Sequence, residues 1–373
     1  MGSDDSMPKK QAENTTDSLK RANTKLGLDN IKTNNIIFVY CPPRVGSTSL
    51  VSSLRVSASH LYKVLHIHDE NMLHVVGGIE NVSVCDIIEY NSSIGRNVYV
   101  IDIYREPLER KMSEFFGKVA SFHFNNSINA VEQYSIERII KRFNLVFPHV
   151  AEEDHFLEKY TPVIDNPPPK FDTDRGYAHI EYNGIHYIKL RLRDVSSWAT
   201  TIGRFLDIDM AIIRDNERSS LPLNGLYERF KSEYKIPHNF LECIKESKGF
   251  RYYLTEKEQT DYIERLETKS TDECIGFTLD QFNSYIDIST ENQHNVDIEG
   301  DHYFDEGCVC PVCSQARRSV FHKIKCGEVP HRKIIHRILH KEFKLRKIHD
   351  LHNRLQQSQL KQRTGPTPFR FGV

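Results

Sequence analysis

Two short motifs in this sequence combine arginine, glycine and hydroxyl residues in patterns suited to anion binding. The first reads CPPRVGSTS over residues 41–49 and lies between an apolar run and a segment with helical spacing. Gly46 would let backbone amides approach an oxygen closely, and Arg44 would add a planar cation suited to phosphate or sulfate. Because a helix N-terminus presents amides and a positive dipole end, we expect an anion here. The predicted anion-binding residues are Arg44, Val45, Gly46, Ser47, Thr48 and Ser49. An ordinary helix cap is the alternative.

The second motif reads REPLERKMS and places an arginine and a serine eight residues apart. Arg105 would leave the carboxyl end of a strand, where open α/β sheets bind ligands. Pro107 suits the first turn of a helix, which puts Ser113 two turns along that helix. Both side chains could therefore face one phosphate. The alternative for Arg105 is a surface ion pair with Glu106 or Glu109.

The elements that must position these motifs follow from the apolar pattern. Short β-branched and aromatic runs indicate buried strands, and strands that alternate with helices indicate a mostly parallel α/β sheet. Asn183-Gly184 supplies the positive φ values of a tight hairpin turn. Apolar residues at helical spacing after Pro107 predict an amphipathic helix. The expected strands are residues 36–40, 62–67, 98–104, 178–182 and 186–192, and further expected helices are 131–147 and 198–206.

The two motifs together resemble those of sulfotransferases. The first lacks the spacing and the lysine of a Walker A loop. It is similar instead to the 5′-phosphosulfate loop of sulfotransferases, Pro-Lys-x-Gly followed by two Ser or Thr, with Arg44 at the family's lysine position. The second matches the family's Arg-(Asp/Glu)-Pro-x-x-Arg-x-x-Ser motif, which implies that Arg105 and Ser113 hold the 3′-phosphate of the nucleotide.

The resemblance covers about residues 34–206 and is to polysaccharide sulfotransferases, namely the heparan 2-O-sulfotransferase group and sulfotransferase-like proteins of bacterial capsule synthesis. It implies a three-layer, P-loop-like α/β fold with a central, mostly parallel sheet. It also implies 3′-phosphoadenosine 5′-phosphosulfate as the sulfuryl donor, a carbohydrate hydroxyl as the expected acceptor, and chemistry without a metal.

Sulfuryl transfer to a hydroxyl needs a base and cations that stabilise the leaving phosphate. Histidine is the natural base near neutral pH, and two histidines lie at the end of the strand expected at 62–67. We predict His68 as the base and His66 as the next candidate, with Arg44 beside the leaving phosphate. The alternative is that both histidines only end a strand. Further candidates for the base are Asp69, Glu70 and His74. Arg191 and Arg193 are candidates for binding an acidic sugar, and the alternative is that they alternate on the solvated face of a half-exposed strand.

The C-terminal region carries a separate cysteine cluster and a basic segment. Cys310 and Cys313 have the C-x-x-C spacing of zinc sites, and Cys308 and Cys326 would complete four ligands, with His322 or His331 as substitutes. Reduced thiols without a metal are the alternative. Residues 317–354 hold twelve Lys or Arg and three acids, with apolar residues near helical spacing. This pattern predicts a basic amphipathic helix that binds an anionic polymer, a membrane surface or a partner, or packs on its own domain.

Length and composition limit the class of protein. The chain has 373 residues, enough for a substantial core, and 39% of them are hydrophobic, which argues against a disordered chain. No apolar run reaches the roughly 20 residues of a membrane span, and we expect a cytoplasmic location. The expected units are a flexible arm at 1–31, a sulfotransferase-like domain at 32–288, a linker at 289–301 and a small Cys/His-containing helical extension at 302–373.

Two other functions stay open at this point. The first is a zinc-dependent nucleic-acid-binding protein with a degenerate nucleotide module, which the basic C-terminal region suggests. The second is an ATP- or GTP-dependent phosphotransferase, which the missing Walker lysine disfavours.

Overall fold

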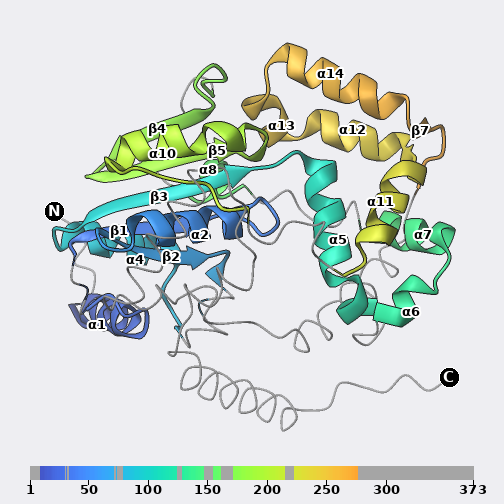
Figure 1. The fold of residues 1–373 in the computed structure, drawn as a ribbon. Helices are drawn as coiled ribbons and strands as arrows, with labels where there is room; N and C mark the ends of the chain where they lie inside the picture. The colour runs from blue at the N-terminus through green and yellow to red at the C-terminus, as the bar shows by residue number, and fades with distance from the viewer. Residues whose placement is uncertain are drawn as a thin grey trace, which may run out of the picture.

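The computed structural model describes residues 9–29, 31, 33–70, 73, 79–123, 128–146, 154–160, 171–214 and 222–275 (Figure 1). Its centre is a five-stranded sheet with the order β2-β1-β3-β5-β4. The strands are β1 (Asn35–Tyr40), β2 (Tyr62–Ile67), β3 (Asn97–Tyr104), β4 (Tyr177–Tyr182) and β5 (Ile185–Arg191). The first four strands of that order run parallel, and β4 pairs antiparallel with β5 at the edge. The chain therefore has a mixed α/β fold with a central, mostly parallel sheet.

Both faces of the sheet are apolar, which explains why the central strands lack a polar alternation. In β1, Ile36 and Phe38 belong to one apolar cluster, while Ile37 and Val39 belong to a second. Successive side chains of a strand point to opposite faces, so each cluster marks one face. Such continuous apolar strands are typical of parallel sheets that helices cover on both sides.

The two apolar clusters show which helices pack on each face of the sheet. The helices α2 (Ser47–Ala58) and α10 (Trp198–Leu206) pack on one face, through residues such as Leu54 and Trp198. The opposite face receives α1 (Lys9–Lys25) and α4 (Val84–Ser93), through Ala22 and Ile87 among others.

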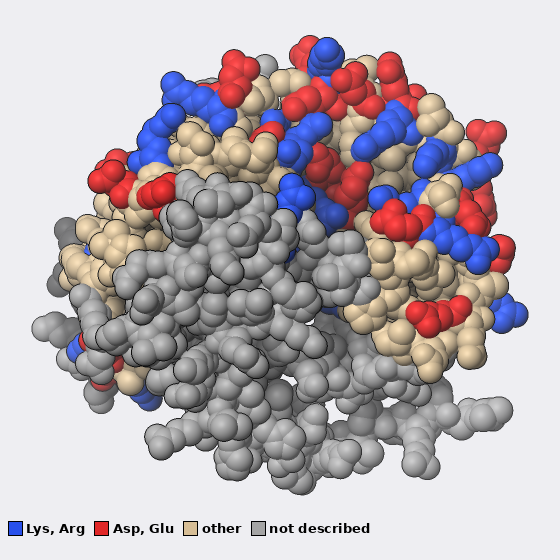
Figure 2. Space-filling model, viewed as in Figure 1, with Lys and Arg blue, Asp and Glu red and all other residues tan. Residues whose placement is uncertain are grey.

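A group of helices extends from the carboxyl end of β3 and lies to the right of the sheet in Figure 1. These helices are α5 (Pro107–His123), α6 (Ile128–Glu132), α7 (Ile136–Val146), α11 (Asn224–Glu233), α12 (His238–Glu246), α13 (Lys248–Tyr253) and α14 (Glu256–Glu267). Phe143 joins them, with its ring centroid 5.4 Å from that of Phe115 and 5.1 Å from that of Phe230. Figure 2 shows Lys and Arg interspersed with Asp and Glu over this part of the molecule.

Smaller elements complete the described chain. They are α8 (His155–Glu158), the 3₁₀ helix η2 (Leu192–Ser197), β6 (Ile236–Pro237) and β7 (Ser270–Thr271). None of the helices in the described ranges is long and apolar enough to cross a membrane.

Most of the expected elements are confirmed, two of them with the same bounds: the strand at 62–67 and the helix at 198–206. The helix expected at 131–147 is instead two helices, α6 and α7, with a break at residues 133–135. The prediction of a flexible arm is wrong for residues 9–29. There α1 forms, Leu26 and Leu28 enter the core, and the Asn23 side-chain amide donates to Asn91 at 3.1 Å. The expected linker at 289–301 and extension at 302–373 lie outside the described residues.

Candidate active site

The loop between β1 and α2 has the tight geometry that its sequence predicts. Arg44 has φ of 68° and Gly46 has φ of 92°, so the loop reverses through two left-handed residues before α2 begins at Ser47. A Cβ on Gly46 would lie 2.6 Å from Cδ1 of Leu192. Glycine alone suits this position, because it adopts a positive φ without strain and has no Cβ to collide with Leu192. Because Gly46 is the N-cap and provides no side-chain cap, the start of α2 suits an external anion.

The second motif holds this loop directly. The Arg105 guanidinium donates from Nη1 to the carbonyl of Arg44 at 2.8 Å, and Arg110 donates from Nε to the carbonyl of Pro43 at 3.4 Å. The Arg44 side chain lies against α5, where a Cβ on Gly117 would collide with its guanidinium. The two motifs, 61 residues apart at Arg44 and Arg105, therefore form one structure.

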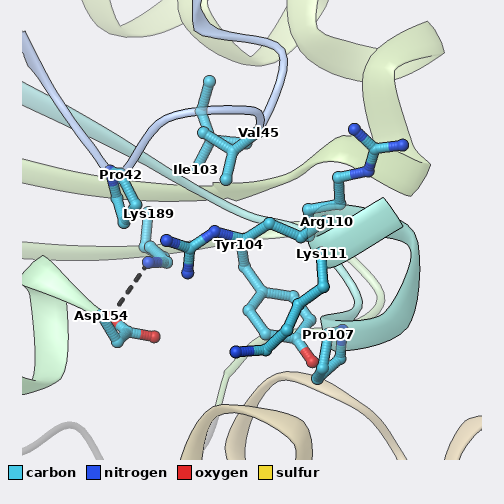
Figure 3. Close-up of a pocket in the computed structure, with 10 residues that line it drawn as sticks. Pro42, Val45, Ile103, Tyr104, Pro107, Arg110, Lys111, Asp154 and Lys189 are labelled. Atoms are coloured by element: carbon cyan, nitrogen blue, oxygen red, sulfur yellow. Dashed lines mark hydrogen bonds and ion pairs between the residues drawn. The ribbon is translucent and has the colours of Figure 1, made fainter. Parts of the chain in front are cut away.

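A pocket opens beside the loop at the carboxyl ends of β1, β3 and β5 (Figure 3). Its charged lining consists of four cations and one carboxylate, namely Arg105, Arg110, Lys111, Lys189 and Asp154. Figure 3 shows the Arg110 side chain extending from α5 toward Lys189. Because the cations outnumber the carboxylate, the pocket favours an anionic ligand.

Two of the lining residues, Lys189 and Asp154, belong to a buried ion cluster that extends behind the pocket to Asp102. The Lys189 ammonium group lies 2.8 Å from Oδ2 of Asp102 and 3.1 Å from Oδ1 of Asp154. Burial raises the pKa of Asp102 to about 6, although Lys189 opposes that shift. Burial alone would lower the pKa of Lys189, but the two carboxylates raise it overall. The lysine therefore stays charged at the pocket.

The predicted histidines lie next to the loop but do not line the pocket. Nδ1 of His68 is 2.8 Å from the carbonyl oxygen of Cys41, and burial lowers the pKa of His68 to about 4. His68 is therefore neutral near pH 7 with its proton on Nδ1, because a carbonyl only accepts. His66 is fully buried in β2, and its ring centroid lies 4.7 Å from that of His68. Its position is that of a core residue.

Of the other predicted site residues that the structure describes, Val45 lines the pocket and the rest lie outside its lining. Ser47 is buried with its hydroxyl hydrogen-bonded to the Cys41 thiol. Ser113 lies half-buried on α5 and is not among the residues that line the pocket. Glu70 accepts from the Tyr40 hydroxyl at 2.8 Å and from Lys159 at 3.0 Å. Thr48 and Ser49 are half-buried in the first turn of α2, and Asp69 is half-buried after β2.

Arg191 and Arg193 form ion pairs with acidic residues and lie outside the pocket lining. Arg191 is buried and donates from Nη1 to the carbonyl of Tyr253 at 3.0 Å and to Glu258 at 2.9 Å. Arg193 lies 3.4 Å from a carboxylate oxygen of Glu106 and 3.2 Å from one of Glu258. Both arginines therefore connect β5 and the following turn to the helices. The alternative of a solvated strand face is wrong for Arg191, because this side chain is buried.

Sequence reasoning did not identify Lys189, Asp154 or Lys111 as site residues. The one available signal was a charged residue inside a strongly apolar strand, as with Lys189 in IHYIKLR and Asp102 in NVYVIDIY. Buried charges of this kind are rarely tolerated unless they are paired.

No protein-family model, curated protein or solved structure matches the chain. Within the described ranges no group of three or more His, Cys, Asp or Glu side chains could hold a metal ion. The proposed zinc ligands Cys308, Cys310, Cys313 and Cys326 lie outside those ranges, as does His74.

Proposed function

We propose that this chain is a sulfotransferase that moves a sulfuryl group from 3′-phosphoadenosine 5′-phosphosulfate to a hydroxyl group, with a saccharide as the expected acceptor. The observation that carries the proposal is the contact between the two motifs. Arg105 and Arg110 bind the loop carbonyls of Arg44 and Pro43, so both phosphate-binding motifs of the resemblance meet at one cationic pocket. The specific P-loop-like sulfotransferase fold is part of this proposal.

The residues at the pocket fit a donor with several anionic groups. The uncapped start of α2 at Gly46 and the guanidinium of Arg44 suit the 5′-phosphosulfate end. Arg105, which lines the pocket, would hold the 3′-phosphate together with Ser113, which lies on α5 outside the pocket lining. Burial raises the pKa of the Cys41 thiol, so this thiol adds no negative charge beside the loop.

The chain's own residues divide the remaining tasks by their chemistry. Arg44 would stabilise charge on the leaving oxygen by hydrogen bonding from its guanidinium group, which presents several N–H donors in a planar fork. His68 carries its proton on Nδ1, so Nε2 is its acceptor nitrogen, but His68 lies outside the pocket lining. Burial is the main reason that the pKa of His68 is low and Arg44 a smaller one, so a bound anion beside Arg44 would offset only the smaller cause.

The direct test is transfer of a radiolabelled sulfuryl group to a panel of acceptors that includes chemically desulfated heparin and a simple phenol. We expect label in at least one acceptor and a loss of at least about tenfold in Arg44→Ala, since a charge-assisted contact to the leaving group contributes more than about 1.4 kcal/mol. Arg265→Ala is the matched control, because Arg265 is exposed and pairs with Glu109 at 2.9 Å on the outer helices. Label in no acceptor, or equal activity in both variants, would contradict the proposal.

A further inference from the structure

Asp154 presents its two carboxylate oxygens to different surroundings. Oδ1 accepts three hydrogen bonds: from the Leu157 amide at 3.2 Å, from Lys189 at 3.1 Å and from the Tyr253 hydroxyl at 3.0 Å. Every hydrogen bond to this carboxylate within the described residues ends on Oδ1. Figure 3 shows the other oxygen, Oδ2, turned away from Lys189 on the side of the pocket where Lys111 and Tyr104 lie.

The three contacts on Oδ1 fix the carboxylate while leaving Oδ2 able to accept. An ionised carboxylate has about four lone-pair directions, so Oδ2 can take a further hydrogen bond. Asp154 is 6% exposed, and its backbone is fixed because it is the N-cap of α8. The result is a rigid hydrogen-bond acceptor in a pocket whose other charged groups all donate, and neither His66 nor His68 lines that pocket.

We propose that Asp154 is the base that removes the acceptor's hydroxyl proton, an inference that rests on the function proposed above. In this step the acceptor oxygen forms a bond to sulfur while the bond from sulfur to the bridging oxygen of the donor breaks. The hydroxyl proton passes to Oδ2 of Asp154. The electron pair of the broken bond stays on the phosphate oxygen that leaves, where the arginines stabilise the charge.

The buried cluster supplies a matched control for this role. Asp102 contacts the same ammonium group as Asp154, at 2.8 Å, but it is fully buried. Its carboxylate also accepts from the amides of Ile103 at 2.6 Å and Phe156 at 3.0 Å. An asparagine at either position removes one negative charge next to Lys189, yet only the one at 154 removes a carboxylate oxygen from the pocket.

The experiment measures hydrolysis of the radiolabelled donor, in which water replaces the acceptor, together with the Kd of adenosine 3′,5′-bisphosphate by calorimetry. In Asp154→Asn we expect turnover to fall by at least about a hundredfold, the lower end for loss of a general base. The Kd should stay equal or decrease, because a negative charge has left a cationic pocket. Asp102→Asn should keep turnover within about tenfold of the wild type. Asp154→Ser provides a second variant that keeps the helix cap while removing the base.

Each outcome separates this inference from the proposed function. If the wild type neither hydrolyses nor transfers the sulfuryl group, the proposed function is wrong and the inference with it. If the wild type is active and the Asp154 variants bind the nucleotide but keep its turnover, only the inference is wrong. Equal losses in Asp154→Asn and Asp102→Asn would also overturn it, since that result assigns Asp154 only the task of holding Lys189.

Discussion

His155 is a buried imidazole that should make the stability of the fold depend on pH. It is fully buried against Tyr40, with ring centroids 4.3 Å apart, and neither ring nitrogen has a hydrogen-bond partner among the described residues. Burial first, and then the positive charges of Lys159 and Lys189, lower the pKa of His155 from 6.5 to about 2. The folded chain therefore keeps this ring neutral at pH values where the unfolded chain protonates it.

The sign and size of the effect follow from proton linkage. Because the folded-state pKa lies below the unfolded-state value, the unfolded state gains a proton as the pH falls through 6.5, and the folded state is destabilised. One such group changes the free energy of unfolding by about 2 kcal/mol between pH 7 and pH 5. The substitution His155→Leu removes this pH dependence and also removes an unpaired polar ring from the core. The free energy of unfolding of the variant should therefore rise relative to that of the wild type as the pH falls.

The assay is urea denaturation of the wild type and His155→Leu at pH 7, 6 and 5. The difference between their free energies of unfolding should shift by about 2 kcal/mol in favour of the variant across this range. His68, which titrates in the same direction, is present in both proteins and cancels. His60→Leu is the control, since His60 is exposed and meets water in both states. Parallel pH profiles for the wild type and His155→Leu would refute the reasoning.

Two glycine substitutions test the loop and its contact with α5. Gly117→Ala should displace the Arg44 guanidinium and weaken binding of adenosine 3′,5′-bisphosphate by about tenfold, because one charge-assisted contact is lost. Gly225→Ala is the control, since a Cβ there meets open space, and it should leave the Kd unchanged. Calorimetry distinguishes the two, and equal Kd values would contradict the packing described for Arg44. Gly46→Ala should lower the free energy of unfolding by more than the roughly 1–2 kcal/mol that positive φ costs. Gly95→Ala is the control, because Gly95 also has a positive φ, of 83°, but a Cβ there would have no neighbour within 4 Å. Thermal denaturation of both variants therefore separates the cost of the collision with Leu192 from the cost of the positive φ. Equal losses of stability would mean that the loop relieves this collision.

The positions of the strands, of the loop and of the helix that carries the second motif could be predicted because each is a local pattern. The strand at 62–67, YKVLHI, is apolar at four of its six positions, and the loop at 41–49 turns through the left-handed Gly46. The helix break at 133–135 was missed because apolar residues at helical spacing continue across it. The start of the chain was missed because α1 is mostly polar and buries only residues near its end, such as Ala22.

The cluster beneath the pocket could not be predicted from local patterns. Asp102 and Lys189 lie 87 residues apart and meet only because β3 and β5 are neighbours in the sheet. Asp154 joins them from the N-cap position of α8, a helix of only four residues. Arg191 was also mispredicted because its partner is distant in sequence. Its alternation with Arg193 indicated an exposed strand face, whereas it is paired with Glu258 of α14.

The proposed function requires that the pocket binds a 3′-phosphorylated nucleotide in preference to other nucleotides. The most direct measurement compares the rise in melting temperature produced by adenosine 3′,5′-bisphosphate and by ADP, in the wild type, Arg105→Ala and the control Arg265→Ala. A ligand at a hundred times its Kd stabilises the folded state by about 2.7 kcal/mol. We expect a clear rise with adenosine 3′,5′-bisphosphate in the wild type and in Arg265→Ala, little rise with ADP, and no rise in Arg105→Ala. An equal response to both nucleotides, or an undiminished response in Arg105→Ala, would contradict the proposed function.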